Sequence, residues 1–149
     1  MHKGHLDLEI KEIFAIRSHG IRSSVRCAPL FVWTVDWSRC NITRLRFCNH
    51  LGGNLASLHT IDEYNFIRGV ILRVTGYHKS TWVGGHDAVR EGVWLWSDGS
   101  LFDFTGWAYR EPNNYKGRED CMEINFAGRD YVNDNRCYRR KSFVCIKRL

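Results

Sequence analysis

The chain has 149 residues and a formal net charge of +6, a size that fits one globular domain with a buried core. Its hydrophobic fraction of 44%, which includes six tryptophans, excludes an intrinsically disordered chain. No apolar stretch approaches the roughly 20 residues of a transmembrane helix, and no nucleic-acid-binding motif accompanies the basic charge, so we expect neither a membrane span nor a nucleic-acid partner.

The cysteine content indicates an oxidising compartment. Six cysteines in a short chain favour a disulfide framework over a cytosolic enzyme, and no Cys-x-x-Cys spacing indicates zinc. Residues 1–26 lack the continuous apolar segment of a signal peptide, because charged residues interrupt it. We therefore predict an N-terminal segment over 1–26, a domain over 27–149 and a secreted protein with no signal peptide visible in this sequence.

Two local patterns each have an ordinary and a functional interpretation. The basic run Arg139-Arg140-Lys141 is either a solvated face or a surface that attracts anionic glycans and bacterial surfaces. The triplet Asn41-Ile42-Thr43 is either an N-glycosylation site of a secreted chain or an unused match to that motif.

One helix is well marked in the sequence. Thr60 followed by Glu63 is a capping box, which is typical of a helix start. Apolar residues then recur at the spacing of one helical face, and Gly76 is a suitable stop. We expect this helix to be structural. The residues of its apolar face are Ile67, Val70, Ile71 and Val74.

Several later segments predict strands. The tryptophans Trp94 and Trp96 alternate along the chain just ahead of the turn Asp98-Gly99, which indicates a hairpin. We expect both rings to be core anchors rather than sugar platforms. The predicted strand segments are Thr81–Gly85, the hairpin Val93–Phe104, Met122–Phe126, Asp130–Val132 and Ser142–Ile146.

Two clusters of oxygen-bearing side chains each lie just ahead of a cysteine. A hard cation such as Ca²⁺ takes six to eight oxygens from carboxylates, amides and water. If the fold joins the clusters, they could supply most of such a shell, and their carboxylates would repel one another strongly without a metal. The alternative is a solvated acidic loop. The candidate ligands are Glu111, Asn113, Glu119, Asn133 and Asp134.

These residues resemble the C-type lectin-like domain. The mannose-type signature of that family is Glu-Pro-Asn, a Glu ahead of a cysteine, and Trp-Asn-Asp ahead of another cysteine. Here Glu111-Pro112-Asn113 and Glu119 match, and the last part reads Val132-Asn133-Asp134. The resemblance runs from about Cys27 to the C-terminus and is nearest to small secreted fish lectins, the ladderlectin and type II antifreeze group. It implies an α+β fold in which two helices flank small antiparallel sheets, with long calcium-binding loops and disulfide staples.

The resemblance also implies a cysteine pairing that six cysteines alone, with fifteen connectivities, do not determine. The implied bridges are Cys27–Cys40, Cys48–Cys145 and Cys121–Cys137. One departure stands out: only Asn41 to Phe47 separate Cys40 from Cys48, where the family needs room for a first strand and most of a first helix. We therefore expect the sheet to lack the strand that normally pairs with the C-terminal strand.

For the site, the resemblance implies that Ca²⁺ completes its shell with two neighbouring sugar hydroxyls. Glu111 would accept a hydrogen bond from one hydroxyl and the Asn113 amide would donate to the other, with Pro112 in a cis peptide. Tyr115 is either a platform for the sugar ring or an ordinary exposed loop residue. The implied sugar-binding residues are Glu111, Asn113, Glu119, Asn133 and Tyr115. An auxiliary calcium site would use Asp87, Glu91 and Asn114, and would share Glu119.

We expect binding rather than catalysis. Glycoside hydrolysis needs a protonated carboxyl, which metal-held carboxylates cannot supply, and no Ser/His/Asp arrangement stands out in the sequence. The resemblance implies calcium-dependent binding of mannose, fucose or N-acetylglucosamine type glycans, in innate recognition of microbial surfaces. A shallow, weak site would favour a homo-oligomer, which gains avidity. Two alternatives are an ice-binding protein on the same fold and a protein-binding module without sugar affinity.

Overall fold

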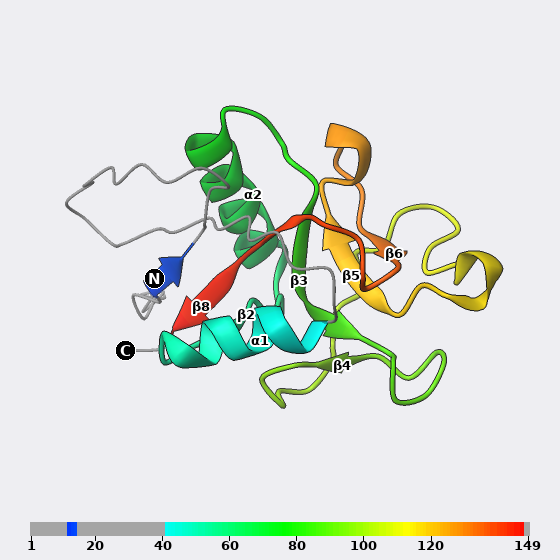
Figure 1. Cartoon of the computed structure of the whole chain (residues 1–149). Helices are drawn as coiled ribbons and strands as arrows, with labels where there is room; N and C mark the ends of the chain where they lie inside the picture. The colour runs from blue at the N-terminus through cyan, green and yellow to red at the C-terminus, as the bar shows by residue number, and fades with distance from the viewer. Residues whose placement is uncertain (1–11, 15–40, 148–149) are drawn as a thin grey trace, which may run out of the picture.

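The computed structural model describes residues 12–14 and 41–147, and it has the α+β architecture that the resemblance implies. Two helices lie beside small sheets, and long irregular segments separate β3 from β5 (Figure 1). The elements are β1 (Glu12–Phe14), α1 (Asn41–His50), β2 (Asn54–Leu55), α2 (Ile61–Thr75), β3 (Thr81–His86), β4 (Leu95–Trp96), β5 (Cys121–Ile124), β6 (Asn133–Asn135), β7 (Ser142–Phe143) and β8 (Cys145–Lys147), with 3₁₀ turns at Tyr115–Gly117 and Phe126–Gly128.

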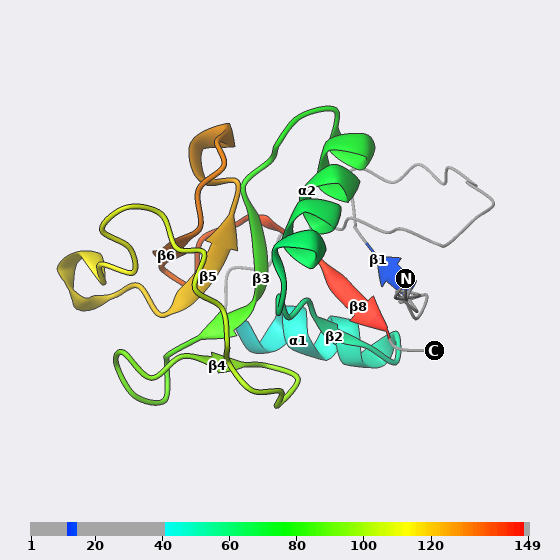
Figure 2. The same cartoon turned by 180° about the vertical axis from the view of Figure 1, so that it is seen from behind.

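The strands form two sheets. The first has the order β1-β8-β2, and the second has the order β4-β3-β5-β6 with β7 added beside β3. All pairs are antiparallel except the parallel pair β3–β7. Both views show β3 between the helical side of the molecule and the side that carries β5, β6 and the long loops (Figures 1 and 2).

Helix α2 forms where the sequence predicts it. The Thr60 hydroxyl accepts a hydrogen bond from the Glu63 amide (3.1 Å), and the Glu63 carboxylate accepts one from the His59 amide (2.8 Å). Gly76 ends the helix with φ at +82°, a left-handed conformation that glycine adopts without strain. Three of the four predicted residues of the apolar face are buried in the core, and the fourth, Val74, is partly buried and packs against it. The predicted capping box and helix are confirmed.

The strand next to β8 comes from an unexpected part of the chain. β1 pairs with β8 in antiparallel register, with Ile13 opposite Ile146. The ten residues of α1 supply the first helix. The expectation that this sheet edge lacks a strand was therefore wrong, because a segment upstream of Cys27 fills it. The predicted Cys27–Cys40 bridge lies outside the described residues.

Two of the implied disulfides are present. Cys48–Cys145 joins α1 to β8 across 97 residues, and Cys121–Cys137 joins β5 to the turn after β6 across 16 residues. Closing loops of these lengths stabilises a fold by about 3–5 kcal/mol each in the chain-entropy account. The second bridge holds the two oxygen-rich clusters close together.

An aromatic cluster supports the long loops. Trp96 is 3% exposed and packs against Phe102, with ring centroids 4.7 Å apart. Trp94 packs against Trp107 at 4.6 Å. The predicted core role of both tryptophans is confirmed, although the predicted hairpin is not: β4 pairs with β3 instead. The segment after Asp98 packs its aromatic rings inward rather than forming a second strand.

Candidate calcium and sugar site

Asp134 joins the two oxygen-rich clusters. It lies on β6, and its carboxylate accepts hydrogen bonds from the backbone amides of Asn113 (3.1 Å) and Asn114 (2.7 Å). The Glu111–Pro112 peptide that leads into this loop is cis, as the resemblance implies. A short strand thus holds the Glu111–Asn114 loop in place through one carboxylate.

Glu111 and Asn113 form an adjacent acceptor and donor. The Asn113 amide nitrogen donates to Glu111 Oε1 at 2.8 Å, while Glu111 Oε2 is buried with no hydrogen-bond partner among the described residues. Burial raises the pKa of Glu111 to about 7, and the nearby Asp134 carboxyl contributes to the increase. The unpartnered oxygen and the raised pKa both indicate a carboxylate that lacks a nearby positive charge.

Glu119 belongs to the same group of side chains. It is 9% exposed, and its Oε2 accepts a hydrogen bond from the Tyr115 amide at 3.1 Å. Burial raises the pKa of Glu119, and the negative charge of Asp134 raises it further. Four predicted ligands therefore lie together: Glu111, Asn113, Glu119 and Asp134.

The fifth predicted ligand, Asn133, is adjacent to Asp134 but points its amide nitrogen elsewhere. That nitrogen donates to Glu123 Oε1 at 3.1 Å and to the Asp134 carbonyl. Our sequence interpretation assigned no role to Glu123. A carboxylate within the otherwise apolar segment Met122–Ile124 was the available signal.

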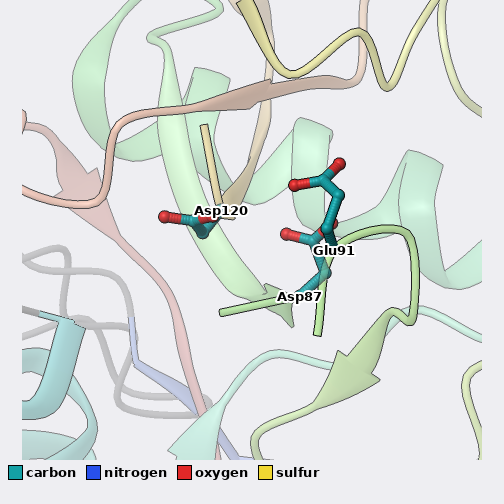
Figure 3. Close-up of side chains that lie close together, drawn as sticks. All are labelled: Asp87, Glu91 and Asp120. Atoms are coloured by element: carbon teal, nitrogen blue, oxygen red, sulfur yellow. The ribbon is translucent and has the colours of Figure 1, made fainter. Parts of the chain in front are cut away.

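A second acidic group lies between β3 and β5. Asp87 follows β3, Glu91 lies on the loop after it, and Asp120 precedes β5 (Figure 3). One carboxylate oxygen from each lies within 4.8 Å of the others. Asp87 Oδ1 is buried without a partner among the described residues, and burial raises the pKa of Asp87.

The structure brings together only some of the residues predicted for the auxiliary calcium site. The Asn114 side chain donates to Glu91, but its amide oxygen accepts a hydrogen bond from the Glu119 backbone at 3.1 Å. Asp120 completes the acidic group instead, and our sequence interpretation missed it. Its position directly after Glu119 was the signal that could have identified it.

These residues fit a calcium ion. All the candidate side chains are Asp, Glu or Asn, which offer carboxylate or amide oxygens, the ligands that hard cations prefer. Two of the carboxylates, Glu111 and Asp87, each have a buried oxygen without a hydrogen-bond partner among residues 41–147. A divalent cation would satisfy these oxygens and offset the mutual repulsion of the carboxylates.

Tyr115 lies beside this group on the loop surface. Its side chain is 58% exposed, and the Lys116 ammonium lies 5.2 Å from the ring centroid. The ring is therefore accessible to a ligand that contacts Asn113 or Asn114.

A Ser/His/Asp arrangement that the sequence does not reveal is present elsewhere. Ser100 Oγ lies 3.2 Å from His59 Nε2, and His59 Nδ1 lies 2.8 Å from Asp103 Oδ1. The Ser100 hydroxyl, however, donates to Asp98 at 2.5 Å. Its proton is therefore directed away from the imidazole, which a nucleophilic serine would need as its base. Ser57 also donates to Asp98, so the network braces the turn after β4.

The Lectin C-type domain family model matches residues 18–147. The chain belongs to this family. The galactose-specific lectin nattectin of Thalassophryne nattereri is 40% identical over 124 residues, covering 83% of this chain and 75% of nattectin. Ladderlectin of Oncorhynchus mykiss is 47% identical over 92 residues, covering 62% of this chain and 48% of ladderlectin, so the chain spans about half the length of that relative.

The similarity extends to solved structures. A Ca²⁺-dependent type II antifreeze protein in its Ca²⁺-free form superposes with a TM-score of 0.65 at 29% identity, covering 72% of this chain and 83% of that one. The lectin relatives support carbohydrate binding for this family member, and the family is generally non-enzymatic and generally uses Ca²⁺. In the part of the chain that the structure describes, no helix is long and apolar enough to cross a membrane.

Proposed function

We propose that this protein is a calcium-dependent lectin for mannose-type sugars. The observation that carries the proposal is the Glu111–Asn113 pair beside buried, clustered carboxylates. The pair presents a hydrogen-bond acceptor and a donor 2.8 Å apart, on a loop that Asp134 holds through two backbone amides. Adjacent hydroxyls of a sugar need such alternating partners.

Five side chains would hold the ion. When bound, Ca²⁺ would neutralise the carboxylates and accept two neighbouring sugar hydroxyl oxygens. Glu111 would accept a hydrogen bond from one hydroxyl, and the Asn113 amide would donate to the other. Tyr115 would contact the sugar ring, since its side chain is 58% exposed. The ligand set is Glu111, Asn113, Glu119, Asn133 and Asp134. A second ion would be held by Asp87, Glu91 and Asp120, beside Asn114.

The sugar preference rests on the order of the two polar side chains. A carboxylate at 111 and an amide at 113 match the mannose-type signature, and we infer a preference for mannose, fucose or N-acetylglucosamine. The name of nattectin describes a galactose-specific lectin, which makes galactose the competing candidate. A site built for one hydroxyl arrangement leaves a polar group unpaired with the other, at about 1–3 kcal/mol per group.

Competition for an immobilised mannose polymer tests the preference. Free mannose should displace the protein at concentrations well below those of galactose or lactose, by roughly 10-fold or more for one unpaired group. Equal displacement by mannose and galactose would show that the Glu111–Asn113 order does not set the specificity.

We further propose that the protein is secreted, takes part in innate recognition of microbial glycans, and gains avidity as a homo-oligomer.

A second candidate function is ice binding, which the structural similarity to a type II antifreeze protein favours. Thermal hysteresis measured on the purified protein distinguishes the two, because ice binding produces it without any glycan. A protein-binding module without sugar affinity would have no use for the buried carboxylates clustered around Asp134.

A further inference from the structure

The carboxylate of Glu123 is fully buried in the second sheet, with 0% exposure. On β5 it lies opposite Asn133 of β6 on one side and Trp82 of β3 on the other. A buried carboxylate costs free energy unless other groups compensate its charge and hydrogen-bond both of its oxygens. Glu123 is not among the proposed calcium ligands, so a buried charge in this position needs another physical reason.

The two oxygens of Glu123 have different partners. Oε2 accepts hydrogen bonds from the Lys141 ammonium and the Ser80 hydroxyl. Oε1 accepts from the side-chain amides of Asn133 (3.1 Å) and Asn135 (2.6 Å). Every one of these partners is a donor. One oxygen is thus used for charge compensation, and the other is used to hold two asparagine side chains.

Lys141 is itself fixed in place. Its ammonium lies 5.3 Å from the Trp82 ring centroid and 5.9 Å from that of Phe126, and it donates to Ser80 Oγ at 3.0 Å. Its side chain is 15% exposed, against 0% for Glu123. The ion pair is therefore largely shielded from water, which strengthens the interaction and restricts both side chains.

The hydrogen bonds to Glu123 fix the orientation of the Asn133 side-chain amide. An amide has a donor nitrogen on one branch and an acceptor oxygen on the other. Both hydrogen bonds that the structure gives to the Asn133 side chain use its nitrogen. The opposite orientation would bring the amide oxygen against the Glu123 carboxylate, which offers no proton. The oxygen is therefore the atom left for a cation, and Ca²⁺ binds amides only through oxygen.

We propose that Glu123 is a positioning residue of the calcium site, which orients the Asn133 amide so that its oxygen faces the ion. This inference rests on the proposed function. Groups that hydrogen-bond a metal ligand commonly change metal affinity by 10–100-fold when they are removed.

The test measures Ca²⁺ binding to the full chain by isothermal titration calorimetry, with Ca²⁺ alone as the ligand. In Glu123→Gln, the new side-chain amide can accept or donate, so Asn133 loses its fixed orientation. We expect Ca²⁺ affinity to fall by roughly 10–100-fold. The matched control is Ser80→Ala, which removes a hydrogen bond to Oε2 and leaves Oε1 with its amide partners. It should keep affinity close to that of the native chain.

A double-mutant cycle distinguishes a positioning role of Glu123, exerted through Asn133, from a general role in the stability of the fold. If Glu123 acts through Asn133, then Glu123→Gln should weaken Ca²⁺ binding much less in an Asn133→Ala background than in the native one. Equal effects in both backgrounds, or native affinity in Glu123→Gln alone, would overturn the inference. A native chain that binds no Ca²⁺ would instead overturn the proposed metal site, and this result appears before any variant is made.

A measurement on the native chain covers the case in which the variant does not fold. In ¹⁵N-edited NMR spectra, the side-chain amide protons of Asn133 should exchange slowly with water, with and without Ca²⁺, because they donate to Glu123 in both states. The exposed Asn65 side chain on α2, outside the proposed site, provides the internal reference for fast exchange. Exchange at Asn133 as fast as at Asn65 would overturn the inference.

Discussion

Glu111 combines two properties that oppose each other when no cation is nearby. It is withdrawn from water next to Asp134, and one of its oxygens has no partner among residues 41–147. Burial and Asp134 raise its pKa from 4.5 to about 7. A carboxyl whose pKa is raised on folding makes the native state bind more protons than the unfolded state between these two values, so the metal-free fold loses stability as pH rises through this window.

We predict that Glu111→Gln raises the melting temperature of the metal-free protein at pH 8 by a few degrees. The difference from the native chain should shrink towards pH 5, where Glu111 is protonated in the native fold. Thermal melts in chelator at both pH values measure it. The variant should also lose the increase in melting temperature that Ca²⁺ gives the native chain. A native chain that is more stable than the variant at pH 8 without metal would contradict this account of Glu111.

The order of the carboxylate at 111 and the amide at 113 is expected to set the sugar preference. The double change Glu111→Gln with Asn113→Asp reverses that order. We expect the preference for mannose over galactose to fall by roughly 10-fold or more, and to shift towards galactose. Direct titration of both sugars against both proteins checks it. An unchanged ratio of the two affinities would mean that other side chains set the preference.

Within each of the two oxygen-rich segments, the side chains proposed to bind Ca²⁺ lie close together along the chain, so residue-level reasoning on the sequence could single them out. It missed Asp120 and Glu123 for different reasons. Asp120 joins Asp87 only because β3 and β5 pair side by side. Glu123 matters through Lys141 and Asn133, which lie 18 and 10 residues away in sequence. Contacts of this kind depend on strand register, which local patterns do not specify.

At the scale of elements, the close approach of β2 and β8 depends on a glycine. A Cβ added to Gly53 would lie 2.4 Å from the Ile146 carbonyl oxygen, a backbone atom that cannot move away alone. Gly69 of α2 differs, because a Cβ there meets nothing within 4 Å. The two positions form a matched pair for the same substitution.

We predict that Gly53→Ala destabilises the fold by about 1–3 kcal/mol, the usual cost of overpacking. Gly69→Ala should instead stabilise it by about 0.5–1 kcal/mol, because alanine is favoured over glycine within a helix. Urea unfolding of both variants measures the two changes. Destabilisation by both substitutions to a similar degree would show that the approach of β2 to β8 is not the cause.

Helix α2 was predictable because its cap, its apolar spacing and its terminal glycine are all local signals. The hairpin over 93–104 was predicted wrongly. Alternating tryptophans also occur where the rings pack into the core and the two halves of the segment do not hydrogen-bond to each other as strands. The backbone amide and the hydroxyl of Ser100 both donate hydrogen bonds to the Asp98 carboxylate. These bonds hold a turn after β4, and the described residues beyond it do not pair with β4 as the other half of a hairpin.

At the scale of the whole molecule, β8 is the strand that holds the first sheet together. It pairs with β1 and β2, and Cys145 at its start is bridged to α1. The sequence could not reveal the β1 pairing, because more than 130 residues separate Ile13 from Ile146 and a three-residue strand has no distinctive pattern.

We predict that deleting residues 1–14 lowers the melting temperature by several degrees and promotes self-association, because one edge of β8 loses its partner. A second truncation that removes only residues 1–10 keeps β1, so the difference between the two isolates the strand. Thermal melts and sedimentation measure both effects. Identical melting of the two truncated chains would mean that β1 adds nothing to the sheet.

The central claim is that clustered oxygen ligands hold Ca²⁺ and that the ion is needed to bind sugar. Its most direct test is retention of the native chain on immobilised mannose in the presence of Ca²⁺, followed by elution with a chelator. We predict retention with Ca²⁺, release by the chelator, and no retention when the chelator is present from the start. Retention that persists in chelator, or a chain that passes through mannose and galactose columns alike in Ca²⁺, would contradict the claim.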